Sequence, residues 1–463
     1  MYFWNLQIKF DQIAIIDNKY GSFTYSSLDE KVQTVKKLLP SCDRKQHGLI
    51  LCRNEVGPLV AYLAALQKQD AVMLLDEKLN RQLLSEILEI YKPNWIFSVN
   101  QRFDFSDRYE CEQYEYCQIW TRRKNTIPYF INPDLALLLS TSGTTGSVKF
   151  VRLSYNNIVA NAKSIKEYLN ITSEDRGLAN LPLNYSYGLS IINSHLLAGS
   201  TVLLTNESVM TKSFWDFMKS KKATSFAGVP YTYQMLHRVG FHKMKLPHLR
   251  YFTQAGGALN EKLVRLFGEY AKEQGKQFFV MYGQTEATAR ISYLPPDKTL
   301  EKPTSIGKAI PGGNLHLDPE TNELIYEGPN VMMGYAVNIE DLAKIDELRG
   351  YLRTGDLATL DEEGFFYLKG RLTRFIKLFG LRLNLDDIEK QIESRLGTNV
   401  VCVGTDNKMA IVVRNMEMKD KIQEIVEDLY KLHPSAFVVK VIEDIPRLAN
   451  GKIDYKILLD LVF

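Results

Sequence analysis

The sequence is poor in cysteine, and the arrangement of the cysteines argues against two classes of protein. The 463 residues include five, at Cys42, Cys52, Cys111, Cys117 and Cys402. None of them forms a CxxC pair or stands at metal-ligand spacing from a histidine. Neither a disulfide scaffold nor a zinc site is therefore expected, and the simplest interpretation is reduced thiols in a cytoplasmic protein.

The chain also lacks long apolar runs and an excess of charge of one sign. No segment reaches roughly 18 uninterrupted apolar residues, and the first residues show neither a basic start nor a small-residue cleavage site, so we expect no membrane span and no signal peptide. The 57 basic and 54 acidic residues are interspersed and leave a formal charge of +3. Nothing in this balance indicates a nucleic-acid partner.

What the sequence does contain is an alternation of short apolar runs and amphipathic stretches. Residues 48–52 and 71–75 predict strands on either side of a helix at 57–69, and further strands are expected at 94–99, 223–229 and 249–257. This pattern is typical of parallel sheets covered by helices. We predict an α/β fold with a large N-terminal domain of mostly parallel sheets flanked by helices, including a β-rich subdomain.

The pattern changes near residue 370. The segment before it predicts a hairpin around the acidic turn at 361–364. The segment after it contains two amphipathic helices, at 385–397 and 419–432, and three strands, at 399–405, 409–415 and 436–443. We therefore predict a domain at residues 1–370 and a small α+β domain at 371–463.

The stretch LLLSTSGTTGSVKFV at 137–151 places an apolar strand directly before a loop of glycines and hydroxyl residues that Lys149 closes. Glycines let backbone N–H groups converge on an anion, while the hydroxyls and the lysine add donors and a positive charge. The spacing differs from GxxxxGK[ST], and Phe150 stands where a Walker A loop has a hydroxyl. The stretch predicts a phosphate-binding loop of another kind, at the carboxyl end of a strand.

Four more segments follow in a fixed order: MYGQTEAT at 281–288, YLRTGDLATLDEEGFFYLKGR at 351–371, RFIKLFGLRLNLDDIE at 374–389 and IPRLANGKID at 445–454. Together with STSGTTGSVK, they resemble the core motifs of the adenylate-forming superfamily. That superfamily includes acyl-CoA synthetases, adenylation domains that load carrier proteins, and luciferase-like enzymes. The resemblance covers nearly the whole chain and implies that a carboxylate attacks the α-phosphate of ATP, giving an acyl-adenylate and pyrophosphate.

The resemblance also implies roles for individual residues. Thr285 would contact phosphate, Glu286 would bind Mg²⁺, and Asp356 would accept hydrogen bonds from the ribose hydroxyls, which suits a carboxylate with several lone pairs. A simple β-turn competes with the nucleotide role of the QAGGAL segment at 254–259. The ATP-binding residues implied by the motifs are Thr141, Ser142, Gly143, Thr144, Thr145, Gly146, Lys149, Gly256, Gly257, Ala258, Tyr282, Gly283, Gln284, Asp356 and Arg371.

Lys452 in ANGKID corresponds to the catalytic lysine of the superfamily, which approaches the carboxylate and the α-phosphate. In that superfamily the small domain is mobile and swings about a hinge, presenting a second face that guides a thiol to the adenylate. Gly380 would lie on the second face. The usual acidic or lysine hinge residue corresponds here to Thr373, followed by Arg374, so this chain departs from the pattern at the hinge.

The segment PLNYSYGLS at 182–190 resembles the part of the superfamily that gates the acid. Gly188 stands where amino-acid-activating members often have an aspartate, which makes a free α-amino acid less expected, and Tyr185 replaces a common histidine. Arg290 has two interpretations, as a partner of a second acidic group on the substrate or as a structural ion-pair partner. The predicted substrate pocket consists of Tyr185, Tyr187, Gly188, Ala227, Gly228, Val229, Gln254 and Gln284.

The sequence leaves the final acceptor open. The first hypothesis is an acid–thiol ligase that uses ATP, Mg²⁺ and coenzyme A. The second is a stand-alone adenylation enzyme that loads the phosphopantetheine of an acyl or peptidyl carrier protein or another acceptor. The third is a nucleotide-responsive binding protein that has lost catalysis, which the joint retention of Lys149, Glu286, Asp356, Arg371 and Lys452 argues against.

Overall fold

The computed structural model describes two compact units of the chain. The described residues are 2–7, 11–99, 102–123, 129–140, 149–378, 381–405, 408–430, 436–448 and 451–463. The first unit is formed from Met1–Thr141, Ser147–Asn314 and Glu327–Leu352, and the second includes Leu315–Tyr326 and Arg353–Phe463. The predicted domain boundary after residue 370 falls within the second unit and stays a prediction.

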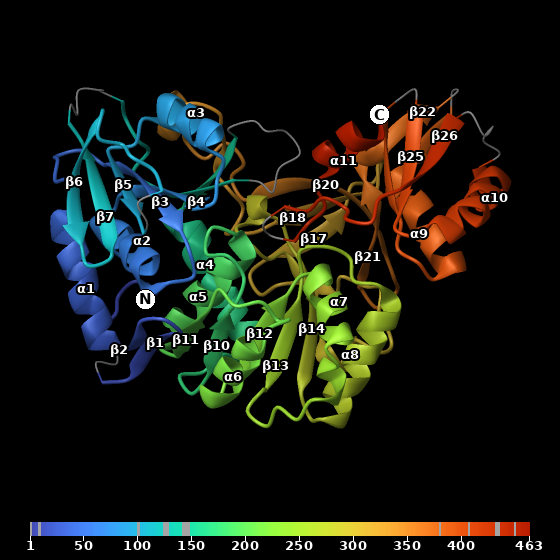
Figure 1. The fold of residues 1–463 in the computed structure, drawn as a ribbon, viewed down its shortest axis with the longest axis horizontal. Helices are drawn as coiled ribbons and strands as arrows, with labels where there is room; N and C mark the ends of the chain where they lie inside the picture. Colours follow the sequence, from blue (N-terminus) through green and yellow to red (C-terminus); the bar gives the residue numbers. More distant parts are fainter. Residues whose placement is uncertain are drawn as a thin grey trace. The chain divides into compact units, whose positions relative to one another are not determined.

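A nine-stranded sheet in the first unit has the order β16-β15-β14-β13-β12-β10-β11-β1-β2 (Figure 1). Its central strands from β14 to β1 are all parallel, as the continuous apolar runs of the sequence predicted. The carboxyl ends of these strands therefore meet at one edge of the sheet. The strands are β1 Ile13–Asp17, β2 Gly21–Thr24, β10 Arg176–Ala179, β11 Thr201–Leu204, β12 Ser225–Gly228, β13 Tyr251–Gln254, β14 Gln277–Tyr282, β15 Ser292–Leu294 and β16 Lys308–Ala309.

The other large sheet of this unit has eight strands in the order β19-β9-β8-β4-β3-β5-β7-β6. Strands β5, β3, β4 and β8 are parallel, whereas β9 pairs antiparallel with β8. The phosphate loop predicted from the sequence therefore joins two antiparallel strands. The strands are β3 His47–Cys52, β4 Ala71–Asp76, β5 Trp95–Ser98, β6 Tyr109–Tyr114, β7 Cys117–Arg122, β8 Leu135–Ser140, β9 Phe150–Ser154 and β19 Gly334–Ala336.

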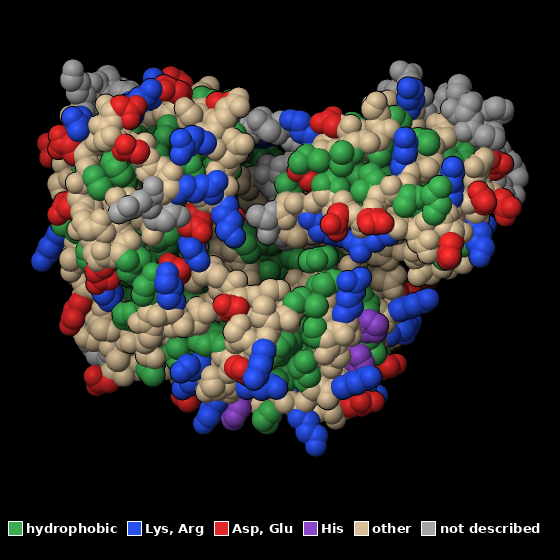
Figure 2. Space-filling view, viewed as in Figure 1, with side chains coloured by type: hydrophobic (Ala, Val, Ile, Leu, Met, Phe, Trp, Pro, Cys, Tyr) green, Lys and Arg blue, Asp and Glu red, His purple; other side chains and the backbone are tan. Residues whose placement is uncertain are grey.

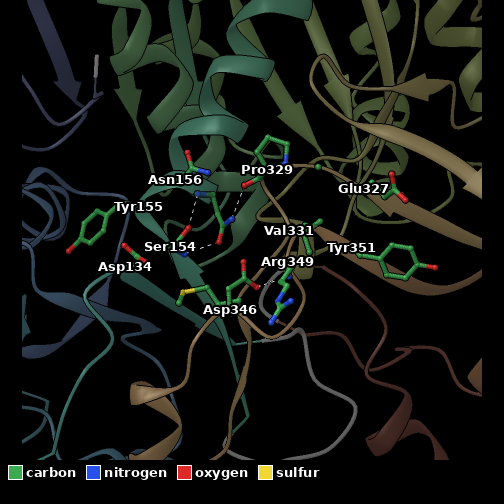
Figure 3. A pocket seen from close by; sticks show the side chains of 14 residues that line it. Asp134, Ser154, Tyr155, Asn156, Glu327, Pro329, Val331, Asp346, Arg349 and Tyr351 are labelled. Atoms are coloured by element: carbon green, nitrogen blue, oxygen red, sulfur yellow. Dashed lines mark hydrogen bonds between the residues drawn. The ribbon is translucent and has the colours of Figure 1, made fainter.

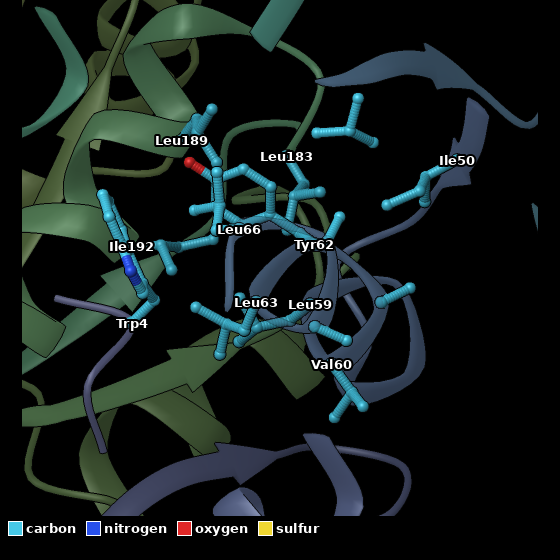
Figure 4. Packing of buried hydrophobic residues seen from close by; sticks show 14 of the residues in the cluster. Trp4, Ile50, Leu59, Val60, Tyr62, Leu63, Leu66, Leu183, Leu189 and Ile192 are labelled. Atoms are coloured by element: carbon cyan, nitrogen blue, oxygen red, sulfur yellow. The ribbon is translucent and has the colours of Figure 1, made fainter. Parts of the chain in front are cut away.

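The core of the first unit joins residues of both sheets through α1, α2 and α5. Every residue of α2 from Val56 to Leu66 is buried, because apolar side chains face both sheets (Figure 4). Helices α7 and α8 lie beside β12–β14 (Figure 1). The helices are α1 Tyr25–Leu38, α2 Val56–Lys68, α3 Arg81–Tyr91, α4 Tyr155–Tyr168, α5 Ser186–Ala198, α6 Lys212–Ser220, α7 Pro230–Arg238 and α8 Glu261–Glu273, with 3₁₀ turns η1 Phe241–Lys243, η2 Thr285–Ala287, η3 Pro296–Lys298 and η4 Glu340–Ala343.

The second unit combines a four-stranded sheet, a β-hairpin and a small three-stranded sheet with helices. The predicted acidic turn is present between β20 and β21, where the Asp361 carboxylate accepts hydrogen bonds from the backbone N–H groups of Glu363 and Phe365. The elements are β17 Asn314–Leu317, β18 Glu323–Glu327, β20 Tyr351–Leu360, β21 Phe366–Arg371, η5 Leu372–Arg374, β22 Phe375–Leu378, β23 Leu381–Asn384, α9 Leu385–Leu396, β24 Val401–Thr405, β25 Lys408–Val413, η6 Met416–Met418, α10 Lys419–Tyr430, β26 Phe437–Val441 and α11 Tyr455–Val462.

Surface charge and thiols agree with the composition of the chain. Basic and acidic side chains are mixed over the visible face of each unit (Figure 2). All five cysteines are free thiols, with Cys42 and Cys111 exposed and the others buried. Across the described residues, no helix combines the length and the apolar character that crossing a membrane requires.

Candidate functional site

Three neighbouring parallel strands of the nine-stranded sheet deliver the predicted pocket residues to one edge. Gly228 at the end of β12 pairs with Gln254 at the end of β13, which pairs with Val280 near the end of β14. Val229, the 256–258 turn and the 283–286 segment follow these three strand ends. The structure thus brings together residues predicted separately for the acid and for the nucleotide, where open α/β sheets bind ligands.

The turn after β13 depends on a glycine and a buried amide. Gly256 has φ +84°, and a Cβ at this position would lie 2.6 Å from the hydroxyl oxygen of Tyr185. The Gln254 side chain, 1% exposed, donates a hydrogen bond from Nε2 to the carbonyl oxygen of Gly257 at 2.8 Å. Gln254 therefore has a visible role in holding this turn beside the aromatic gate.

The predicted gate forms the start of α5. The rings of Tyr185 and Tyr187 meet edge to face with centroids 6.2 Å apart, and the Ser186 hydroxyl lies 3.3 Å from the Thr285 hydroxyl. A Cβ at Gly188 would lie only 2.2 Å from the carbonyl oxygen of Pro182. No side chain fits at position 188 without a backbone shift, so this position holds no carboxylate for a substrate ammonium group.

A chain of three side chains connects Lys149 with Glu286. The Lys149 ammonium lies 3.4 Å from the ring centroid of Tyr335, and the Tyr335 hydroxyl donates a hydrogen bond to Glu286 Oε1 at 2.9 Å. Burial first, and then the Glu286 charge, raise the pKa of the Tyr335 hydroxyl, which stays protonated and remains a donor. The lysine that closes the predicted phosphate loop and the predicted metal ligand therefore share one site.

The segment that carries Glu286 is held in place by hydrogen bonds that the sequence did not reveal. The Asn330 amide donates to the carbonyl oxygens of Ala287 and Arg290, and the Met332 N–H donates to the carbonyl oxygen of Glu286 at 2.8 Å. Asn330 and Tyr335 are functional candidates that the motifs missed. The only sequence signal is their position in an otherwise apolar segment, residues 330–336.

The donor set fits a magnesium ion that arrives with ATP. Glu286 supplies one carboxylate beside the Thr285 hydroxyl, and within the described ranges no group of three or more His, Cys, Asp or Glu side chains forms a metal site. Mg²⁺ typically uses one or two protein carboxylates together with phosphate oxygens and water. The residues present match that mode of binding and not a metal cage made by the protein alone.

The predicted residues Thr141, Ser142, Gly143, Thr144, Thr145 and Gly146 lie outside the described residues, as does Gly380. The strand before the loop is β8, whose side chains from Leu135 to Leu139 are buried.

Tyr282 at the end of β14 is buried, and its hydroxyl accepts a hydrogen bond from Gln284 Nε2 at 3.0 Å. Only a glycine is accommodated at position 283 without a backbone shift, because a Cβ there would lie 1.9 Å from the carbonyl oxygen of Ala289.

Within the second unit, Asp356 and Arg371 are paired across β20 and β21. Arg371 Nε lies 2.9 Å from Asp356 Oδ1, and Asp356 is 3% exposed. Lys452 lies in a turn in which the Leu448 N–H donates to the Lys452 carbonyl oxygen at 2.8 Å, and Gly451 has φ +82°. The structure thus joins two of the three predicted residues of this unit, and the roles of all three stay predictions.

Arg374 is tied by its side-chain contacts to the elements of the second unit that follow it in the sequence. Its guanidinium binds Asp386, Glu389 at 2.8 Å, the Cys402 carbonyl oxygen at 2.6 Å and the Tyr455 hydroxyl at 3.2 Å. These contacts reach α9, β24 and α11. A hinge at this point would therefore have to lie before Arg374.

The first unit also contains a pocket with a volume of about 830 Å³, away from the strand edge described above. It is formed by the start of α4 and by residues 327–351, with acidic side chains of Asp134, Glu327 and Asp346 in its wall and Arg349 next to Asp346 (Figure 3). The lining of this pocket includes none of the residues predicted for ATP or the acid. The described residues that were predicted for the acid gather instead at the strand edge.

Known CoA ligases are similar to this chain in sequence. A 2-succinylbenzoate–CoA ligase of Bacillus cereus is 28% identical over an alignment 494 positions long, gaps included, covering 99% of this chain and 98% of that relative. The oxalate–CoA ligase of Arabidopsis thaliana is 28% identical over 349 residues, covering 70% of this chain and 67% of the relative.

Solved structures share the fold. O-succinylbenzoate coenzyme A synthetase (MenE) from Bacillus subtilis, in complex with AMP, superposes with a TM-score of 0.78 at 22% identity, covering 98% of this chain and 97% of that chain. Residues 3–336 match the model of a family described as AMP-binding enzyme. The match spans well over half of the sequence, and the chain therefore belongs to the AMP-binding enzyme family.

Proposed function

We propose that this protein is an ATP-dependent acid–CoA ligase that acts through an acyl-adenylate. In the first step a carboxylate oxygen of the acid forms a bond to the α-phosphorus of ATP, and the bond from that phosphorus to the bridging oxygen breaks, releasing pyrophosphate. In the second step the thiol sulfur attacks the acyl carbon, AMP leaves, and the thiol proton passes to solvent. The gathering of Glu286, Tyr335 and Lys149 beside the pocket residues carries this proposal.

The first step joins two anions, so its main demand is charge neutralisation and alignment. Lys149 supplies a positive charge, and the Tyr335 hydroxyl fixes the carboxylate of Glu286. Glu286 would hold Mg²⁺, which would neutralise negative charge on the phosphate oxygens. Asp356, Arg371 and Lys452 keep the roles that their motifs imply, with Asp356 at the ribose and Lys452 at the reacting carboxylate and phosphate.

Coenzyme A is the favoured acceptor because relatives that align with nearly the whole chain are named CoA ligases. A carrier protein is the alternative acceptor, and a cytoplasmic location is part of the proposal. Neither point follows from the fold. The two acceptors differ only in the second step, so both hypotheses predict the same adenylate.

Carboxylate-dependent exchange of pyrophosphate with ATP tests the first step. We would use fatty, aryl, hydroxy, dicarboxylic and amino acids, including 2-succinylbenzoate and oxalate, with Lys452→Ala as the inactive control. Adding coenzyme A or a holo carrier protein to an active acid then decides the acceptor, with the thioester read by mass spectrometry. Binding of ATP without exchange for any acid would favour a binding protein that has lost catalysis.

A further inference from the structure

Arg290 is a buried cation at the predicted acid pocket. Arg290 is 2% exposed, and within the described part of the chain its Nε atom has no hydrogen-bond partner. Among the described residues, no acidic side chain forms an ion pair with it; an Nη atom donates a long hydrogen bond to the Ala289 carbonyl oxygen, at 3.4 Å, and the guanidinium also hydrogen-bonds the neutral hydroxyl of Tyr168. The structural ion pair that was one of its two interpretations is therefore not found.

Aromatic side chains surround the Arg290 guanidinium in place of acids. It lies 4.0 Å from the ring centroid of Tyr187, and its charge also acts on the hydroxyls of Tyr168 and Tyr185. Burial raises the pKa of each of these three tyrosines, so they are neutral and do not balance the charge. Tyr185 and Tyr187 belong to the gate that the sequence assigned to the acid.

Leaving a guanidinium buried without an anion is unfavourable, and stacking on one aromatic ring offsets only part of the desolvation. Arginine is also the side chain whose planar donor fork best matches a carboxylate. Bulk solvent does not balance the charge, since Arg290 is almost fully buried. The arrangement therefore suits an anion supplied by a ligand.

A small cavity borders Arg290. Its volume is about 10 Å³, and its walls include Ile191 of α5, Ala227 of β12 and Thr253 of β13. That volume corresponds to about one water molecule, so the cavity adds space next to the guanidinium but does not hold a whole carboxylate by itself. The other titratable base in its wall, His195, is neutral, because burial lowers its pKa while Nδ1 donates to the Ile191 carbonyl oxygen at 2.7 Å.

We propose that Arg290 binds a second carboxylate of the substrate, so that the acid activated by this protein is a dicarboxylic acid. The inference rests on the proposed function, because it places the substrate at the strand edge beside Tyr185 and Tyr187. One carboxylate reacts with ATP, and the other is held by the guanidinium. Arg290 is in this reading a specificity-determining residue that takes no part in the chemical step.

The test compares matched acids with one and two carboxylates: butanoate with pentanedioate, hexanoate with hexanedioate, and benzoate with benzene-1,4-dicarboxylate. For at least one pair, the full chain should show a higher kcat/KM of pyrophosphate exchange with the diacid. Arg290→Gln should lower kcat/KM for that diacid roughly 10- to 100-fold, the scale of a lost hydrogen-bonded charge. The monoacid should change little, and Arg290→Lys should retain part of the preference.

Calorimetric binding of the same acids to wild type and Arg290→Gln adds a readout that needs no catalysis. Arg265→Gln is the matched control, because Arg265 is a surface residue paired with Glu261 on α8. Equal losses for both acid classes, or a wild-type preference for monoacids, would overturn the inference and leave the proposed function standing. Selective diacid binding without any AMP formation would keep the subsite and refute the ligase, whereas binding of no diacid would overturn the subsite.

Discussion

Removing the hydrogen bond from Tyr335 to Glu286 tests whether these residues form a functional site. Activity should fall if they do, and should stay unchanged if they are near each other by chance. Tyr335→Phe deletes the hydroxyl that lies 2.9 Å from Glu286 Oε1 and keeps the ring under the Lys149 ammonium. We expect Glu286 to lose its fixed orientation, so that Mg²⁺–ATP binds less well and adenylation slows. The fold should be unaffected, because the substitution removes one polar atom and leaves the packing unchanged.

The expected loss of activity in Tyr335→Phe has the same size whether it is taken from the hydrogen bond or from the metal ligand that the bond orients. A hydrogen bond to a charged group contributes about 1.5–3 kcal/mol, which corresponds to roughly 10- to 100-fold in rate or affinity. Removing a residue that orients a metal ligand typically costs about 10- to 100-fold in metal affinity or activity. The expected loss is therefore well above the error of a kinetic measurement.

The assay is pyrophosphate exchange at a series of Mg²⁺ concentrations. Tyr335→Phe should shift the midpoint of the Mg²⁺ dependence upward and lower kcat/KM for ATP. Tyr351→Phe is the control, since Tyr351 is 42% exposed and is not one of the residues predicted to bind ATP, Mg²⁺ or the acid. A Tyr335→Phe protein with the wild-type Mg²⁺ midpoint and rate would refute the role of Tyr335 in orienting Glu286 as a metal ligand.

Four further substitutions test other parts of the structure. Lys452→Ala should lower adenylation roughly 100- to 1000-fold, as expected for one preorganised charge, and near-normal exchange would remove Lys452 from the mechanism. Gly283→Ala should abolish exchange, because its Cβ would lie 1.9 Å from the Ala289 carbonyl oxygen, and activity close to wild type would show that this turn adapts. Arg374→Ala should destabilise the second unit by about 3–5 kcal/mol in denaturant unfolding, because it leaves the carboxylate of Glu389, whose side chain is only 16% exposed, without its guanidinium partner. Burial and the nearby Glu389 raise the pKa of Glu393 to about 7, so stability should fall as the pH rises from the unfolded-state pKa toward 7, and Glu393→Gln should flatten that slope in thermal unfolding between pH 5 and 8.

The sequence predicted the family and the α/β fold, and both are confirmed, as are the helices expected at 57–69, 385–397 and 419–432. The prediction succeeded where the signal is local. The buried parallel strands read as apolar runs, and the segment 57–69 became α2 with nearly the predicted bounds. The motif MYGQTEAT lies at a strand end because β14 carries an apolar run directly before it.

The parts that could not be predicted depend on contacts between distant segments. The Tyr335–Glu286 bond joins residues that are 49 positions apart, and no periodicity marks Tyr335 as special. The two interpretations of Arg290 could be separated only by seeing which side chains surround it. The final helix, α11, was missed because its eight residues at the chain end carry little periodic signal.

The most direct test of the central claim is the identity of the nucleotide product formed before any thiol is added. The protein would be incubated with ATP, Mg²⁺ and the acid most active in exchange, and the products would be read by mass spectrometry. The account predicts pyrophosphate together with an enzyme-bound acyl-adenylate, which releases AMP only when coenzyme A or another acceptor is supplied. Formation of ADP and phosphate, or of no acid-dependent product from any acid class, would contradict it.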